Sequence, residues 1–149
     1  MNRRSLVQLV VVGASLATVT PLYAEDIDFE KQVLPVLEKK CMSCHREAYT
    51  DPAKGRLRKP KGDLRMDMPE DIVKAGESEK PAIFAGEPDK SEALARVLLP
   101  EDSDDFMPSK GDPLTKDEIE ALKSWIQQGA KFGKWKGSKF TPEGEKVKE

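Results

Sequence analysis

The chain has few of the residues from which most metal and nucleophile sites are built: one histidine and two cysteines among 149 residues. A structural zinc site normally takes four cysteine or histidine ligands, so the chain is one ligand short of it. Apolar residues make up only 38% of the chain and aromatic residues 6%. Without the first 24 residues the apolar share falls to about 34%, which is lean for one compact domain. A bound group that adds core volume would offset this deficit.

Charge is nearly balanced, with 25 Lys and Arg against 27 Asp and Glu. Residues 46–65 and 121–149 carry a basic excess, whereas residues 66–120 are acidic. A nucleic-acid-binding domain needs a strong basic excess overall, so we expect no nucleic-acid partner. The loop that contains Arg56, Arg58, Lys59 and Lys61 instead favours an acidic protein partner, whose binding should weaken as salt rises.

The first 24 residues have the pattern of a secretory signal peptide. Two arginines and no acid precede an apolar stretch over residues 5–19, and the segment ends on the small residue Ala24. The stretch is shorter than the ~20 residues of a membrane span and is interrupted by Gln8 and Gly13, which disfavours the alternative of a membrane anchor. No cysteine follows it to carry a lipid. We therefore expect a soluble, exported, periplasmic protein without a membrane span after cleavage.

Apolar spacing and capping residues predict three main helices in the rest of the chain. The first covers residues 28–40, and Pro35 should shorten or kink it. The second covers residues 89–99 and the third residues 115–128, each opened by a capping box. These boxes pair Asp89 with Glu92 and Thr115 with Glu118.

The segments around these helices are polar. Residues 46–65 combine charge with proline and glycine, and we predict a loop without regular structure there. Residues 133–149 are rich in lysine and are predicted to form a charged, frayed C-terminal tail. The prediction is therefore an all-α domain with long loops over residues 25–132, preceded by a signal peptide at residues 1–24.

Cys41-Met42-Ser43-Cys44-His45 has the C-x-x-C-H pattern of covalent c-type haem attachment. Residues three and four apart share one face of a helical turn, so two thiols and an imidazole can reach one object. Cys41 and Cys44 would form thioether bonds to one haem c, and His45 would bind its iron as the proximal ligand. The alternatives are a disulfide between the cysteines, a zinc site with an unidentified fourth ligand, and chance occurrence.

The second axial ligand must be something other than histidine, because His45 is the only one. Methionine is the usual alternative. Met107 lies in a loop before the last predicted helix, where it can fold over the opposite haem face, with Pro108 stiffening the loop. We therefore predict Met107 as the distal iron ligand. In the alternative reading Met107 fills a gap in the core; Met66 and Met68 are interpreted as packing residues.

Several stretches follow one another in order along the chain: Asp28–Leu37, Cys41–His45, Lys61–Asp67, Gly86–Ser91, Phe106–Pro108 and Leu114–Ala130. In this order they resemble the planctomycete-type cytochrome c domain, a branch of the class I c-type cytochromes. The resemblance implies an all-α class I haem domain, His45 as proximal ligand, Met107 as distal ligand and electron transfer as the activity. Ser109 departs from the family, which often has a second proline there.

These observations predict a monohaem cytochrome c that carries single electrons between redox protein partners and is not itself an enzyme. With His45 and Met107 both bound, the iron would have no open site, which favours outer-sphere electron transfer. Three alternatives remain: a haem-based sensor in which Met107 gives way to a small ligand, a thiol–disulfide module, and an electron-transfer subunit of a larger enzyme complex.

The lean core predicts that fold and cofactor depend on each other. A haem would bury a large apolar surface among the predicted helices, so the haem-free chain should be poorly ordered. Thermal unfolding of the haem-free protein, followed by circular dichroism, should show no cooperative transition. A cooperative, native-like transition would contradict this prediction.

Overall fold

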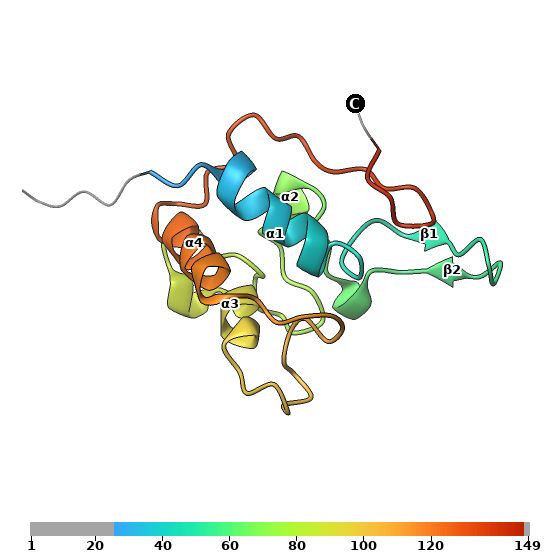
Figure 1. Ribbon diagram of the computed structural model, residues 1–149, viewed down its shortest axis with the longest axis horizontal. Coiled ribbons are helices and arrows are strands. Elements are labelled where there is room, and N and C mark those ends of the chain that lie inside the picture. The colour runs from blue at the N-terminus through green and yellow to red at the C-terminus, as the bar shows by residue number, and fades with distance from the viewer. Residues whose placement is uncertain (1–25, 148–149) are drawn as a thin grey trace, which may run out of the picture.

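The computed structural model describes residues 26–147, and the predicted signal peptide at residues 1–24 lies outside the described residues. Figure 1 shows short helical segments joined by long loops. In chain order the elements are a π-helical turn Phe29–Val33, α1 Leu34–Val36, a π-helical turn Leu37–Cys41, β1 Tyr49–Thr50, β2 Leu57–Arg58, a 3-10 turn Lys61–Asp63, α2 Pro69–Ile72, a 3-10 turn Pro88–Lys90, α3 Glu92–Val97 and α4 Lys116–Gln127. Within residues 26–147, no helix has the length and apolar character needed to cross a bilayer.

The prediction of an all-α domain is wrong. Helix makes up only 34% of the described residues, and β1 and β2 form a two-stranded antiparallel sheet inside the segment predicted as a loop. Asp51 closes the hairpin, because its amide donates to Arg56 O (2.9 Å) and its carboxylate pairs with Arg58 (2.9 Å). This polar segment has no apolar periodicity to support a helix, so local hydrogen bonds around Asp51 decide its structure.

The first predicted helix is observed as one helical stretch from Phe29 to Cys41. Asp28 caps it by accepting a hydrogen bond from the Lys31 amide (3.2 Å). Pro35 lies in the first turn of α1. The turns on both sides are widened, because the amide that closes each one donates to the carbonyl five residues earlier. The helical stretch therefore begins well before the proline.

Of the two predicted capping boxes, one is present in the structure and the other is not. Thr115 and Glu118 form theirs at the start of α4, with both reciprocal hydrogen bonds present. The box at Asp89 is wrong, because α3 begins only at Glu92 and its cap residue Ser91 makes no capping bond. The Ser91 hydroxyl instead accepts from the Phe84 amide (2.9 Å) in the preceding segment.

The core lies between the Phe29–Cys41 stretch and α4, which lie side by side in Figure 1. The Phe29 ring contacts Trp125 of α4 with a centroid distance of 5.0 Å, and contacts Phe132 and Trp135 at 5.3 Å each. Such aromatic pairs stabilise a core beyond the area that they bury. This aromatic cluster therefore joins the start of the domain to its last helix and to the segment beyond it.

The expectation of a frayed tail is wrong for the start of the C-terminal segment. Trp135 is only 8% exposed, and its indole donates to the Ser138 hydroxyl (3.1 Å). Ser138 is also buried and donates to Glu38 in the first helical stretch (2.5 Å). Although the segment is rich in lysine, its two aromatic residues, Trp135 and Phe140, pack in and against the core. The domain boundary at residue 132 stays a prediction.

The buried position of Trp135 can be tested by replacing it with alanine. Trp135→Ala should lower the free energy of unfolding of the haem-loaded protein by about 3–5 kcal/mol, because it leaves a cavity beside Phe29. Phe84→Ala is the control, because Phe84 is an exposed aromatic residue and its loss should cost much less. Urea unfolding measures both values, and equal small losses would contradict the packing described here.

Candidate functional site

A cavity of about 430 Å³ lies between the first helical stretch, the segment around Leu64, α3 and the loop before α4. Its wall contains all four side chains that the sequence singled out: Cys41, Cys44, His45 and Met107. Cofactor and ligand sites typically enclose ~300–1,000 Å³. The fold therefore brings Met107, which is distant in sequence, into one cavity with the Cys41–His45 turn.

The Cys41–His45 turn continues the first helical stretch. The amides of Cys44 and His45 both donate to the carbonyl of Cys41, each at 3.1 Å. The tight turn places both cysteines and the imidazole on the cavity wall. Both cysteines are half-buried free thiols.

His45 is oriented by a backbone carbonyl from another segment. With its proton on Nδ1, the ring donates to Leu64 O (3.3 Å), which leaves the lone pair of Nε2 available to a metal. Burial lowers the pKa of His45, so the neutral, metal-binding form is favoured. The amide of Met66 donates to His45 O (2.7 Å), and that of Lys61 donates to Cys44 O (3.0 Å). The segment from Lys61 to Met66 is therefore fixed against the motif.

Sequence reasoning missed Leu64. Its contribution is a main-chain carbonyl, which every residue type carries, so no side-chain pattern marks the position. The close approach of Gly76 to this segment is also not predictable from a sequence pattern. A Cβ at Gly76 would lie 2.3 Å from Gly62 O, which shows how near the two backbone segments are. Only the folded chain shows that these positions shape the cavity wall.

The environment of Cys41 disfavours disulfide exchange. Burial, reinforced by the neighbouring Cys44, raises the pKa of Cys41 to about 12. A thiol that exchanges disulfides needs a lowered pKa, because the thiolate is the nucleophile. The position is better suited to a sulfur that forms a permanent thioether bond.

Two methionines line the cavity. Met66 is almost fully buried, and its amide is bound to the His45 carbonyl, so its backbone lies on the histidine side. Met107 is half-buried and comes from the loop beside α3, where its amide donates to Arg96 O (3.3 Å). Met68 lines a second cavity of about 520 Å³ instead. Met66 and Met107 therefore reach the cavity from different segments, and of the two only Met66 belongs to the segment that is hydrogen-bonded to His45.

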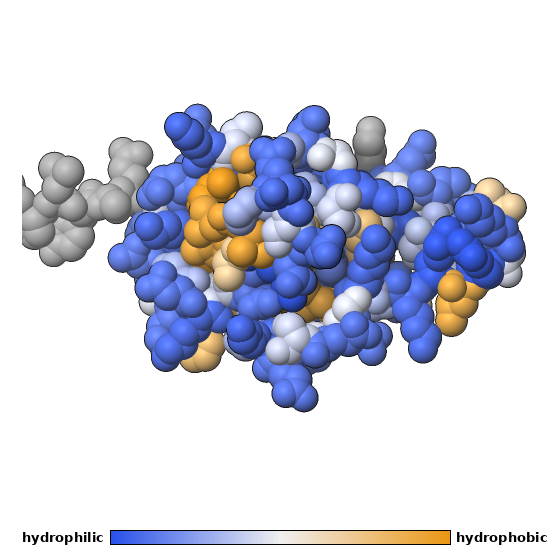
Figure 2. All heavy atoms as spheres, turned by 90° about the horizontal axis from the view of Figure 1, so that it is seen from below, coloured by the Kyte–Doolittle hydropathy of each residue, from blue (hydrophilic) through white to orange (hydrophobic). Residues whose placement is uncertain are grey.

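Charged side chains surround the cavity. Its wall includes the cations Lys40, Lys61, Lys80, Arg96 and Lys110 and the acids Glu77, Glu92 and Asp105. Figure 2 shows that hydrophilic side chains dominate the lower face of the molecule, with apolar surface gathered mainly in its left half. The cavity wall therefore carries a local positive excess on a chain whose net charge is −2.

This donor set fits a covalently bound haem. Two thiols on one turn, an imidazole whose second nitrogen is hydrogen-bonded, and a thioether from another segment are the groups that a c-type haem requires. The residues around the cavity thus define the class of the domain as a c-type haem site.

Comparison with known families agrees. Residues 41–111 match the family model described as Planctomycete cytochrome C, which supports the resemblance to the planctomycete-type cytochrome c domain. The family implies a covalently bound haem c and an electron-transfer function. No curated protein and no solved structure matched the chain.

Proposed function

We propose that the protein is an exported monohaem cytochrome c that carries single electrons between redox protein partners. The observation that supports it is the gathering of Cys41, Cys44, His45 and Met107 on the wall of one cavity. In this proposal the two cysteines would hold the haem through thioether bonds, and His45 and Met107 would provide ligands to its iron. The bound haem supplies an iron that takes up and releases one electron at a time.

The arrangement of the protein groups favours a carrier over an enzyme. The Leu64 carbonyl orients the His45 ring, and Met107 would provide a second protein ligand to the iron. An iron with two protein ligands has no free coordination site for a substrate. The apolar part of the cavity wall would then exclude water from the iron, which leaves electron exchange as the activity.

Export is part of the proposal. The pattern of residues 1–24 supports a cleaved signal peptide, and the cytochrome domain over residues 25–132 would then act as a soluble periplasmic protein. A place within a larger oxidoreductase complex is compatible with the same site.

The proposed partner is acidic. Lys61 lies on the cavity wall, and Arg56 and Lys59 are exposed on the adjoining segment. Arg58 contributes less than the sequence suggested, because it pairs with Asp51 at 2.9 Å. The cations available for docking are therefore Lys61 and its exposed neighbours.

The distal ligand can be tested in protein expressed with the haem-maturation machinery. The oxidised wild type should show the weak near-infrared band of methionine-ligated ferric haem, and Met107→Ala should abolish it. Met68→Ala is the matched control and should retain the band, because Met68 lines the other cavity. A band that persists in Met107→Ala would contradict the assignment and favour Met66.

Two further measurements on the same protein separate the alternatives. Thiol titration after denaturation should recover neither sulfur, because both would be in thioether bonds; recovery of both would favour a thiol–disulfide module. Carbon monoxide should bind slowly and incompletely to the reduced wild type, whereas rapid and complete binding would favour a sensor.

Docking through Lys61 can be tested with an anionic iron cyanide complex as the oxidant. The oxidation rate should fall as the salt concentration rises from about 0.01 M to 0.15 M, because the Debye length shrinks from ~30 Å to ~8 Å. Lys61→Glu should slow the reaction several-fold at low salt. The exposed Lys123 of α4 provides the control, and Lys123→Glu should leave the rate nearly unchanged. Equal effects of the two variants would contradict a docking site at Lys61.

A further inference from the structure

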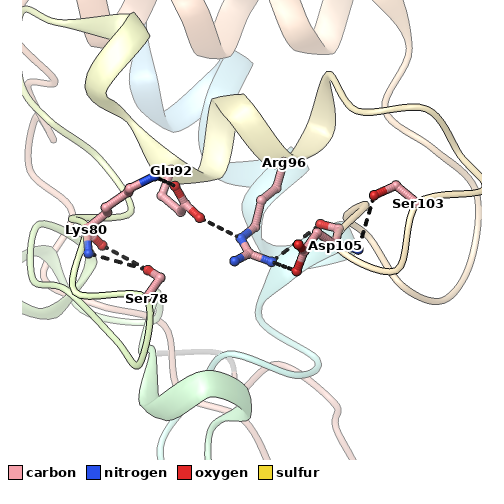
Figure 3. A network of polar contacts seen from close by, with 6 residues as sticks. All are labelled: Ser78, Lys80, Glu92, Arg96, Ser103 and Asp105. Atoms are coloured by element: carbon pink, nitrogen blue, oxygen red, sulfur yellow. Dashed lines mark hydrogen bonds and ion pairs between the residues drawn. The ribbon is translucent and has the colours of Figure 1, made fainter.

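Arg96 of α3 contacts the loop that carries Met107 in two ways. Its carbonyl accepts a hydrogen bond from the Met107 amide (3.3 Å). Its guanidinium donates from Nη1 to a carboxylate oxygen of Asp105 (2.8 Å) and to the Asp105 carbonyl (3.5 Å). One residue therefore contacts the loop on both sides of Phe106. Figure 3 shows the guanidinium of Arg96 between Glu92 and Asp105.

The guanidinium is held in place on its own helix. Glu92 lies one turn earlier and accepts from Arg96 Nε (2.9 Å), and Lys80 lies 3.8 Å from the same carboxylate. The side chain of Arg96 is 28% exposed, whereas that of Asp105 is 72% exposed. Glu92 thus orients a partly buried cation toward an exposed carboxylate of the loop.

The loop folds as a small unit around these contacts. We call residues 103–107 the distal loop. Within it, the Asp105 amide donates to the Ser103 hydroxyl (3.3 Å) and the Phe106 amide donates to the Ser103 carbonyl (3.0 Å). Because these bonds are internal to the loop, the contacts with Arg96 are what attach the unit to α3.

We propose that the Arg96–Asp105 pair keeps the distal loop closed over the cavity, which makes Arg96 a positioning residue for Met107. The inference rests on the proposed role of Met107 as an iron ligand. Arg96, Asp105 and Met107 all line the cavity that holds His45. The pair sets how often the loop opens, and thus how often the sulfur of Met107 would leave the iron.

The solvent exposure of the Arg96–Asp105 pair limits how much its loss can change the opening of the loop. A charge-assisted hydrogen bond is stronger than a neutral one, but a partly exposed pair is weakened by water and salt. Loss of the pair should therefore change the opening equilibrium by no more than about fivefold. A change of this size alters how readily the iron becomes accessible without unfolding the domain.

The test uses the haem-loaded protein and carbon monoxide, which binds reduced iron only after the distal ligand leaves. Asp105→Asn and Arg96→Gln should each raise the rate of carbon monoxide binding by about fivefold. Arg96→Lys keeps the charge but loses the forked geometry, so the rate should lie between those of the wild type and Arg96→Gln. Arg58→Gln is the matched control, because it breaks an arginine–aspartate pair on the hairpin and should leave the rate unchanged.

A double variant tests whether the two residues act together. If they act through one pair, Arg96→Gln with Asp105→Asn should be no faster than Arg96→Gln alone. Hydrogen exchange of the Met107 amide provides a readout that does not depend on carbon monoxide, and it should speed up in Asp105→Asn. Additive rate changes in the double variant would show that the residues act separately and would overturn the inference.

The outcomes distinguish this inference from the proposed function. A wild type without the near-infrared band would refute Met107 ligation and the positioning role with it. A wild type with the band, but with unchanged carbon monoxide binding and amide exchange in Asp105→Asn, would refute only the role of the pair. Because Asp105 is exposed, this variant tests the inference even if Arg96→Gln fails to fold.

Discussion

The contact between Phe29 and Trp125 is the interaction on which the rest of the structure depends. It joins the first helical stretch to α4, with ring centroids 5.0 Å apart, and Trp135 adds a third aromatic ring from the C-terminal segment. Cys41 ends the same helical stretch, so this packing also fixes where the haem-attachment motif begins. An apolar share this small can support a folded domain only if its few large side chains are concentrated in one place.

How well the sequence predicts a feature depends on how far apart in the chain its interacting residues lie. The Cys41–His45 motif and the Thr115–Glu118 capping box are local, and the order of the residues was enough to predict both. The hairpin at Asp51 is also local, but its signal is hydrogen bonding by one side chain within a polar segment, which looks like any loop. The periodicity of apolar residues carries no information about such a turn.

Other features depend on contacts between distant segments, and these could not be predicted from the sequence. The lysine-rich composition beyond residue 133 suggested a solvated tail, yet Ser138 is hydrogen-bonded to Glu38 of the first helical stretch. The Leu64 carbonyl at His45 Nδ1 belongs to the backbone and is independent of the side chain at that position. For the candidate site, the sequence identified the side chains, whereas the groups that orient them required the fold.

The histidine side of the cavity is held by shorter backbone hydrogen bonds than the methionine side. On the histidine side, His45 belongs to the turn that contains both cysteines, and backbone hydrogen bonds of 2.7 Å and 3.0 Å tie this turn to the segment from Lys61 to Met66. On the methionine side, one longer backbone bond of 3.3 Å and a partly exposed ion pair attach the loop to α3. In the proposed function, this difference would give a firmly held His45 and a less firmly held Met107. The attachment of the loop to α3 would then set how readily Met107 leaves the iron.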